Sequence, residues 1–394
     1  MGLIIQKFGG TTVGTLDGRK AVFNRVSKAK KYGHDVVVVV SAMGRRGDPY
    51  ATDTLIDLVK SHCDKVSGQN LDLIMSCGEI ISAVLMASYL ESMGIKAMAL
   101  TGFQAGILRT AEFGDADVLK VDTKLLHKVI RRGIVPIVAG FQGQTDKGDI
   151  TTLGRGGSDT TAIVLGNYLG AGTVEIYTDV PGVAVIDPRI VPETIFLDSI
   201  SFDKMLLLTQ NGSKVVHHKA VKAAMEFDLP FKVKSAFKEG ETLICSESKD
   251  NEPPAIAVQE DMIIVTLIKT AGSLGPHEVL AKQLGCGELV LHFNKKEMAI
   301  LVSKENIYKA ANLANDLKAD LRLTEKVTKI SLIYRDDEPM KKNNERVLSS
   351  LNIPVATQKQ LPGHYLVIVP SERSGDIVKF VYKNLFTDIK CKAV

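Results

Sequence analysis

The stretch Asp35-Val36-Val37-Val38-Val39-Val40 predicts a β-strand with apolar side chains on both faces. Such continuous runs are typical of parallel sheets that are covered by helices on both sides. Short runs of this kind alternate with longer amphipathic stretches from Leu3 to about Ile244, which predicts an α/β sandwich. The other predicted strands are Leu3–Gln6, Lys96–Leu100, Ile134–Ala139, Glu175–Thr178 and Phe231–Lys234. The predicted helices are Asp17–Lys31, Thr54–Lys60, Gly78–Met93, Thr123–Arg132 and Ser158–Leu169.

The polar stretch from Ser246 to Pro254 marks a predicted domain boundary, because its two final prolines continue neither a helix nor an inner strand. Beyond it, the order strand, helix, strand, strand, helix occurs twice at a spacing of about 65 residues, which predicts two ferredoxin-like modules. The first set is Ile263–Ile268, Pro276–Leu284, Glu288–Phe293, Met298–Val302 and Lys304–Lys318. The second set is Val327–Tyr334, Glu338–Leu351, Ile353–Gln358, His364–Val369 and Ser371–Leu385.

Composition narrows the class of protein. Hydrophobic residues make up 45% and charged residues 24%, the balance of a folded globular chain. The formal net charge is only +4, which gives no reason to expect nucleic acid as a partner. The five cysteines are scattered without a CxxC pair, so we expect reduced thiols in a cytoplasmic protein. No signal peptide or uninterrupted apolar run of membrane-spanning length stands out, so we expect no membrane partner.

The first candidate for chemistry is Lys7-Phe8-Gly9-Gly10, where a predicted strand meets a glycine turn. Glycines let backbone N–H groups approach phosphate oxygens, and a lysine at the strand end supplies a positive charge for a phosphoryl group. The order differs from the GxxxxGK[ST] loop, and an ordinary turn explains the segment about as well when it is taken alone.

The second candidate is the glycine-rich stretch Thr151–Ala162, which follows a strand and opens a helix. Ser158 or Asp159 is expected to cap that helix, whose N–H groups attract anions. Arg155 adds a guanidinium that matches a carboxylate in two-point contact. A structural loop with a capping serine is the alternative.

Four further features are weaker when each is taken singly. Thr178 and Asp179 follow a strand, at the sheet edge where ligands of open α/β folds bind. Asp187-Pro188-Arg189 reads as a turn, and Lys214 reads as a surface charge. Glu79 is expected at a helix start, where countering the helix dipole would explain it.

Read in order, these segments resemble the aspartokinases, which belong to the amino-acid kinase superfamily. The resemblance covers residues 3–245. The most specific strings are KFGGTTV (7–13), VVVVVSAMG (36–44), GFQG (140–143), TTLGRGGSDTTA (151–162) and YTDVPGV (177–183). The stretch from Met43 to Asp53 is similar to the short aspartokinases of spore-forming Gram-positive bacteria, which serve diaminopimelate synthesis.

The resemblance implies a three-layer amino-acid-kinase sandwich with a mainly parallel sheet over residues 1–245. Tandem ferredoxin-like ACT modules would follow at 256–325 and 326–394. Whether strands are exchanged between the two modules is left open. It also implies ATP-dependent phosphorylation of the side-chain carboxylate of L-aspartate to L-aspartyl 4-phosphate, the first step toward lysine, diaminopimelate, threonine and methionine. Homodimerisation through the C-terminal modules is expected, whereas the sequence leaves an end-product amino-acid effector open.

The family's site residues map onto this chain by position. Lys7 would contact the ATP phosphates with Gly9 and Gly10 beside it, and Asp159 would organise Lys7 and the magnesium–phosphate array. The substrate set would be Ser41, Thr52, Glu79, Arg155 and Ser158, with Glu79 on the ammonium group. The nucleotide set would be Thr178, Asp179, Asp187, Arg189 and Lys214. Magnesium is expected to arrive on the nucleotide, and no protein-built metal site is predicted.

Two alternatives stay open at this point. One is another amino-acid kinase of the superfamily, against which the combination of Glu79, Arg155 and Ser158 with tandem C-terminal modules argues. The other is a catalytically silent subunit that senses an amino acid, against which the presence of both Lys7 and Asp159 argues. Ala184 and His218 depart from the family pattern, and their effect on nucleotide binding is also open.

Overall fold

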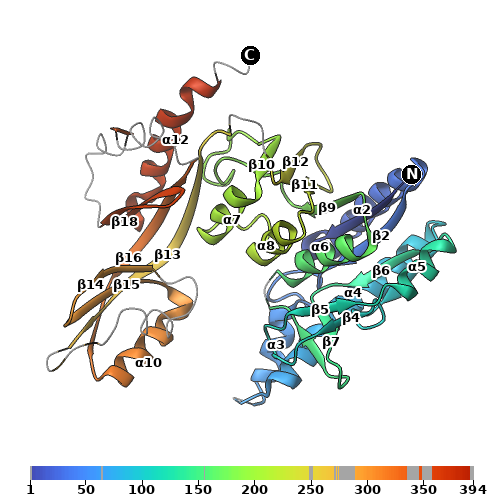
Figure 1. The fold of residues 1–394 in the computed structure, drawn as a ribbon, viewed down its shortest axis with the longest axis horizontal. Helices are drawn as coiled ribbons and strands as arrows, with labels where there is room; N and C mark the ends of the chain where they lie inside the picture. The colour runs from blue at the N-terminus through green and yellow to red at the C-terminus, as the bar shows by residue number, and fades with distance from the viewer. Residues whose placement is uncertain are drawn as a thin grey trace. The chain divides into compact units, whose positions relative to one another are not determined.

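The chain divides into two compact units (Figure 1). The structure, a computed structural model, describes residues 2–63, 65–154, 156–247, 252–269, 272, 274, 289–334, 346–347 and 357–390, with only the backbone at 305, 325 and 387–390. The first unit consists of Met1–Val183, Phe196–Leu206 and Lys214–Asp250. The second consists of Ala184–Ile195, Leu207–Ser213 and Asn251–Val394.

The first unit is built on an eight-stranded sheet with the order β10-β12-β11-β9-β1-β2-β6-β3. All neighbouring strands are parallel except β11 and β12. The strands are β1 (Leu3–Phe8), β2 (Asp35–Val40), β3 (Ala97–Leu100), β6 (Val135–Ala139), β9 (Thr173–Thr178), β10 (Ser199–Ser201), β11 (Phe231–Ser235) and β12 (Glu241–Cys245). The predicted mainly parallel sheet is therefore confirmed.

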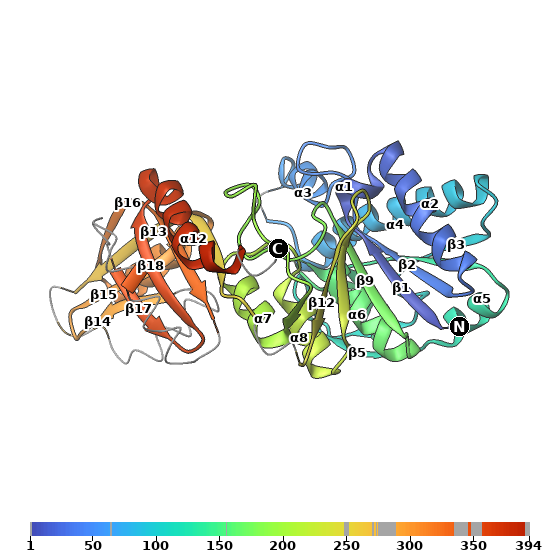
Figure 2. The same cartoon turned by 90° about the horizontal axis from the view of Figure 1, so that it is seen from above.

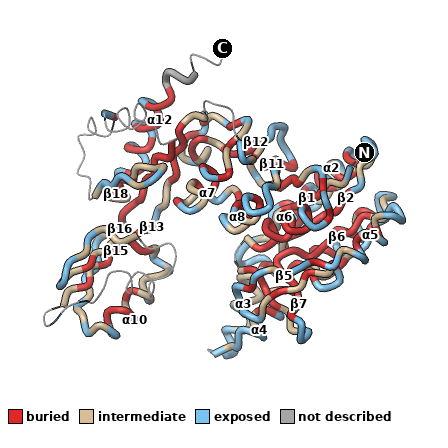
Figure 3. Tube along the Cα trace, in the orientation of Figure 1, coloured by how far each residue is buried: buried red, intermediate tan, exposed pale blue. Residues whose placement is uncertain are grey.

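Helices cover both faces of this sheet, which makes three layers (Figure 2). Val36, Val38 and Val40 of β2 belong to the core cluster under α2 and α4, whereas Ile5 of β1 lies beside α6 on the other face. Val36 to Val40 are all buried, as two-sided coverage requires (Figure 3). The helices are α1 (Gly10–Val13), α2 (Leu16–Lys31), α3 (Thr52–Lys60), α4 (Gly68–Ser92), α5 (Lys124–Arg131), α6 (Gly157–Leu169), α7 (Phe202–Gln210) and α8 (His218–Glu226).

A small four-stranded sheet, with the order β5-β4-β7-β8, packs next to α4. Its strands are β4 (Ile107–Arg109), β5 (Val118–Val121), β7 (Gln142–Gln144) and β8 (Ile150–Thr152). None of these four strands is among the predicted ones, because runs of three or four mixed residues carry little periodicity. Asp72 of α4 ties the helix to this sheet, since its Oδ2 accepts from the Thr152 amide at 2.9 Å.

Helix α4 begins ten residues earlier than the predicted Gly78, because Ser67 caps it by accepting from the Asn70 amide. Among the described helices it is also the one that is long and apolar enough to cross a membrane by length and composition. Its contacts with β3, β6 and β8 and its buried Asp72 and Glu79 instead describe the core helix of a globular unit.

The second unit contains a six-stranded antiparallel sheet with the order β14-β15-β13-β16-β18-β17. Two long strands, β13 (Ala255–Ile268) and β16 (Asp320–Ile333), pair with each other at its centre. The other described elements are β14 (Leu289–Phe293), β15 (Glu297–Ser303), η1 (Lys304–Asn306), α10 (Ile307–Leu317), β17 (Thr357–Leu361), β18 (His364–Pro370), η2 (Ser371–Arg373) and α12 (Ser374–Lys390). The predicted helices Pro276–Leu284 and Glu338–Leu351 lie outside the described residues, apart from 346–347 within the second.

Each half of this sheet has the strand order of a ferredoxin-like module. β13 pairs with β15 over Met262–Ile268, while its first residues, Ala255–Gln259, pair with the second half of β16. That second half also pairs with β18, so the four-stranded half around β18 is completed by the first residues of β13, whose later residues belong to the other half. The two predicted modules therefore share one continuous sheet.

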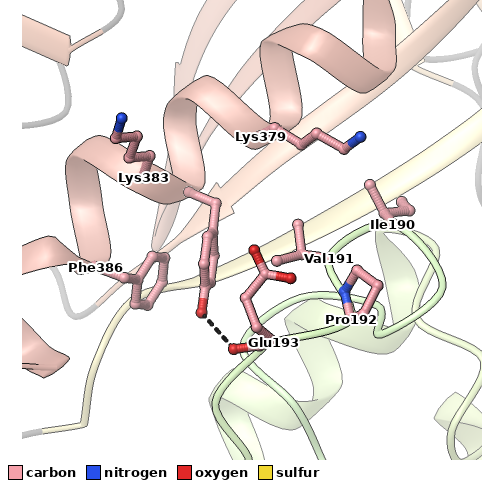
Figure 4. Close-up of a pocket in the computed structure, with 8 residues that line it drawn as sticks. Ile190, Val191, Pro192, Glu193, Lys379, Lys383 and Phe386 are labelled. Carbon is pink, nitrogen blue, oxygen red and sulfur yellow. Dashed lines mark hydrogen bonds between the residues drawn. The ribbon is translucent and has the colours of Figure 1, made fainter.

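The second unit also has a cavity of about 490 Å³ between α12 and residues 190–193 (Figure 4). The Tyr382 hydroxyl donates to the Glu193 carbonyl oxygen at 3.3 Å, and the Tyr382 and Phe386 rings stack with centroids 4.9 Å apart. Lys379, Lys383 and Glu193, the charged residues of its lining, are all exposed. A cavity in the first unit, whose charged residues include buried ones, is the better candidate for chemistry.

Candidate active site

The candidate site starts at the carboxyl end of β1. Lys7 places its Nζ 2.6 Å from Oδ1 of Asp159 in the first turn of α6, and both side chains are only 11% exposed. The carboxyl ends of neighbouring parallel strands meet at one edge of a sheet, and ligands of open α/β folds bind there. The structure thus brings together the two residues that the sequence analysis assigned to catalysis.

The turn after β1 packs tightly against the end of β2. A Cβ atom on Gly10 would lie 2.0 Å from the carbonyl oxygen of Ala42, so this position has room only for glycine. Gly9 precedes α1 as its N-cap residue. The close approach brings the backbone of the Lys7–Gly10 segment against Ser41 and Ala42, which line the same cavity as Lys7.

Helix α6 begins differently from the prediction. Its N-cap residue is Gly156, in the left-handed conformation with φ 71°, and no side chain caps the helix. Ser158 and Asp159 lie instead within the first turn, so the predicted capping role is wrong. Asp159 Oδ2 accepts from the His217 amide at 3.3 Å, which orients the other oxygen toward Lys7.

Glu79 lies in the interior of α4 rather than at its start, so the predicted dipole role is wrong. Its Oε1 accepts from the Ala42 amide at 3.0 Å, while Oε2 is buried without a hydrogen-bond partner among the described residues. Burial raises the pKa of Glu79 to about 8, although the Ala42 amide and the charge of Lys7 both act to lower it. An orphaned oxygen of this kind suits a cationic ligand group.

These groups line one cavity of about 540 Å³. From the predicted set it contains Lys7, Ser41, Thr52, Glu79, Ser158 and Asp159. The described residues also include lining groups that the prediction did not name, which are Ala42, Asp53, Ile56, Met75, Gly114, Phe141, Gly154, Gly156 and Gly157. A volume of this size is in the range of small-molecule sites.

Phe141 is the most informative of the missed residues, because it adopts φ 69°, a conformation that non-glycine residues rarely take. It lies within the GFQG string, which was quoted only for the resemblance. Nothing in the string itself indicates a left-handed phenylalanine.

Other predicted residues lie elsewhere. The Thr178 hydroxyl accepts from the Val180 amide at 3.1 Å and so closes the turn after β9. Asp179 and Lys214 are exposed, and neither lines the cavity. Asp187 and Arg189 belong to the second unit, where they pair with each other. Arg155 lies outside the described residues.

No group of three or more His, Cys, Asp or Glu side chains that could hold a metal ion occurs within the described ranges.

Comparison with known proteins identifies the family. The profile of the amino acid kinase family matches residues 2–235. Aspartokinase 1 of Bacillus subtilis (strain 168) is 37% identical over 348 residues, which cover 84% of this chain and 85% of that protein. The chain belongs to the aspartokinase family. This agrees with the resemblance, including its similarity to proteins of Gram-positive spore formers.

Solved aspartokinase structures share the fold. Aspartokinase III of E. coli in complex with aspartate and ADP (R-state) has a TM-score of 0.77 and 22% identity, covering 98% of this chain and 100% of that one. The same enzyme in complex with lysine and aspartate (T-state) has a TM-score of 0.70 and 23% identity, covering 98% and 99%. Both likenesses extend through the C-terminal unit.

Proposed function

We propose that this aspartokinase transfers the γ-phosphoryl group of ATP to the side-chain carboxylate of L-aspartate. The observation that carries the proposal is the buried Lys7–Asp159 ion pair in a cavity that also contains the orphaned Glu79 oxygen. The site thus offers a cation for phosphate and a buried carboxyl group that can ionise to bind an α-ammonium group. The membership of the family and the complex of E. coli aspartokinase III with aspartate and ADP support it.

The chemistry needs positioning more than acid–base catalysis. An aspartate carboxylate is already ionised at neutral pH, so it attacks the γ-phosphorus without a general base. In this reaction the carboxylate oxygen forms the new P–O bond, and the bond to the β-phosphate oxygen breaks to release ADP. Lys7 would stabilise charge on the transferring group, and Ser158 with Arg155 would hold the substrate carboxylates. Glu79 would bind the ammonium group.

Magnesium would be carried on the ATP phosphates. Asp159, the buried carboxylate next to Lys7, is the described group whose chemistry fits a contact with a nucleotide-bound cation. When bound, the ion would neutralise phosphate charge. We further propose that Thr178, Asp179, Asp187, Arg189 and Lys214 contribute to nucleotide binding.

The test is a coupled ADP assay of the purified chain with aspartate, glutamate and acetylglutamate. We expect turnover with aspartate and at least about a 100-fold loss in Lys7→Ala, because removing one transition-state donor commonly costs this much. Lys31→Ala, at an exposed position in the last turn of α2, is the matched control and should keep full activity. Turnover with glutamate or acetylglutamate alone would assign the chain to another amino-acid kinase, and an inactive wild type would indicate a sensor subunit.

For the second unit we propose ACT-like modules at 256–325 and 326–394 that mediate homodimerisation in the cytoplasm. The continuous six-stranded sheet supports this proposal. Sedimentation analysis should give twice the chain mass of 42.7 kDa, and a monomer would overturn it. Calorimetric titration with lysine, threonine and diaminopimelate, with and without ATP, decides whether the unit also binds an effector.

A further inference from the structure

Arg109 at the end of β4 is the largest fully buried side chain in the described part of the molecule. Its Nη1 donates to the carbonyl oxygens of Phe141 at 2.8 Å and Thr151 at 3.1 Å. Nε and Nη2 have no hydrogen-bond partner among the described residues, and Arg109 makes no direct ion pair with any of them. Burial lowers the pKa of its guanidinium to about 9, although the charge of Asp72 acts to raise it. A buried cation without an ion-pair partner is costly, so a purely structural role would be better filled by an apolar side chain.

Through its hydrogen bond to the Phe141 carbonyl oxygen, Arg109 can influence the conformation of a residue that lines the active site. Phe141 lines the cavity in a left-handed conformation, which is unfavourable for a residue with a Cβ atom and needs support from its surroundings. Thr161 of α6 supplies one support, since its Oγ1 accepts from the Phe141 amide at 3.0 Å. Arg109 supplies another, at the carbonyl end of the same residue.

The backbone at Phe141 in turn packs against the first turn of α6. A Cβ atom on Gly157 would lie 3.1 Å from Cα of Phe141, and one on Gly140 would lie 2.8 Å from Cβ of Ser158. A shift of the Gly140–Phe141 turn therefore displaces Ser158, which also lines the cavity. The chain of contact runs from Arg109 through Phe141 to the turn of α6 that carries Ser158.

We infer that Arg109 is a positioning residue that holds the Phe141 turn against α6 and thereby sets the binding of the aspartate carboxylates. This inference rests on the proposed function. Gly143 belongs to the same arrangement, because the Arg109 side chain crosses the place of its missing Cβ, which would lie 2.7 Å from Nε.

The test compares KM for aspartate, KM for ATP and kcat in variants of the full chain. In Arg109→Met we expect KM for aspartate to rise about tenfold or more, while KM for ATP changes less than threefold, because the displaced turn adjoins Ser158. Arg109→Lys should recover only part of the loss, since an ammonium group lacks the planar fork. Arg132→Met, at an exposed position after α5, is the matched control and should leave all three constants unchanged.

A second variant removes the other hydrogen bond that supports the Phe141 turn. Thr161→Val removes the oxygen that accepts from the Phe141 amide and should also raise KM for aspartate selectively. Combined with Arg109→Met, its effect should be less than multiplicative, because both changes release one turn.

The outcomes separate the two proposals. An unchanged KM for aspartate in soluble, folded Arg109→Met would overturn the positioning role, as would equal rises in both KM values. Loss of thermal stability with unchanged KM would show a merely structural arginine. Absence of aspartate-dependent ADP formation by the wild type would instead overturn the proposed function.

Discussion

The proposed contact of the buried Glu79 carboxyl with the substrate ammonium would link the binding of substrate to the loss of a proton. Its pKa is raised to about 8 by burial, so only about one site in ten is ionised at pH 7. If Glu79 binds the substrate ammonium as an anion, KM for aspartate should fall about fivefold or more between pH 7 and pH 9. Initial rates across this range measure the effect.

Glu79→Gln provides the comparison for this pH dependence. The variant keeps the size of the side chain but cannot ionise, so its KM should be higher and flat over the same range. A flat profile in the wild type would show that Glu79 does not titrate on binding.

The same residue predicts how stability depends on pH. Between about pH 4.5 and pH 8 the folded chain keeps a proton on Glu79 that the unfolded chain has lost. Unfolding therefore releases a proton, and this residue makes the free energy of unfolding decrease as pH rises through that window. Denaturant unfolding of Glu79→Gln and wild type should converge toward pH 4.5 and diverge toward pH 8, with the variant more stable. The opposite trend would contradict the raised pKa.

For single residues, the sequence predicts which side chains take part in chemistry better than it predicts which of them are buried. Lys7 and Asp159 could be predicted as partners through the resemblance to the aspartokinases, because the strings KFGGTTV (7–13) and TTLGRGGSDTTA (151–162) contain these two residues. Burial of Glu79 could not, since a glutamate within a helix is usually exposed. Arg109 was missed for the same reason: charged residues in short, irregular strands give no sign that the fold encloses them.

Among the helices, the start of α6 depends on a glycine that two requirements select. Gly156 has φ 71°, and a Cβ there would lie 2.0 Å from the His217 ring. Gly170, which ends the same helix, has φ 62° and nothing within 4 Å of its missing Cβ. A comparison of these two glycines therefore separates the cost of a left-handed backbone from the cost of a steric clash, within one helix.

Gly170→Ala should cost about 1 kcal/mol of stability from the left-handed backbone alone and keep full activity. Gly156→Ala should cost more and should also reduce kcat at least about tenfold, because His217 donates its amide to Asp159. Thermal unfolding and steady-state kinetics of both variants provide the measurement. Equal activity in the two variants would remove the steric argument.

Long, buried elements were the predictable part of the fold. Val36–Val40 could be assigned because five consecutive valines suit little else, and β2 has the predicted bounds. The start of α4 was missed because Gly68-Gln69-Asn70 looks like a loop, although Ser67 before it is a good capping residue. The strands of the small sheet owe their formation to tertiary contacts such as Asp72 with Thr152, which no local pattern encodes.

At the scale of the whole molecule, the shared sheet predicts how the second unit unfolds. Ile300 of β15 and Ile368 of β18 are both fully buried, in different halves of the sheet. Because β13 and β16 run through both halves, Ile300→Ala and Ile368→Ala should each shift the same calorimetric transition to lower temperature. Each substitution should lower the free energy of unfolding by about 2–5 kcal/mol. Separation of that transition into two, with each variant moving only one, would show that the halves fold independently.

The second unit is built from three separate stretches of the chain, which limits how it can be exchanged between related proteins. Besides the chain from Asn251 onward it includes Ala184–Ile195 and Leu207–Ser213, and the Ile256 amide donates to the Val185 carbonyl oxygen at 2.6 Å. A chimera that joins the first 250 residues to the tail of a different relative would place foreign sequence against two native stretches that belong to the same unit as the original tail. An intact second unit could therefore be transplanted only by exchanging three separate stretches together.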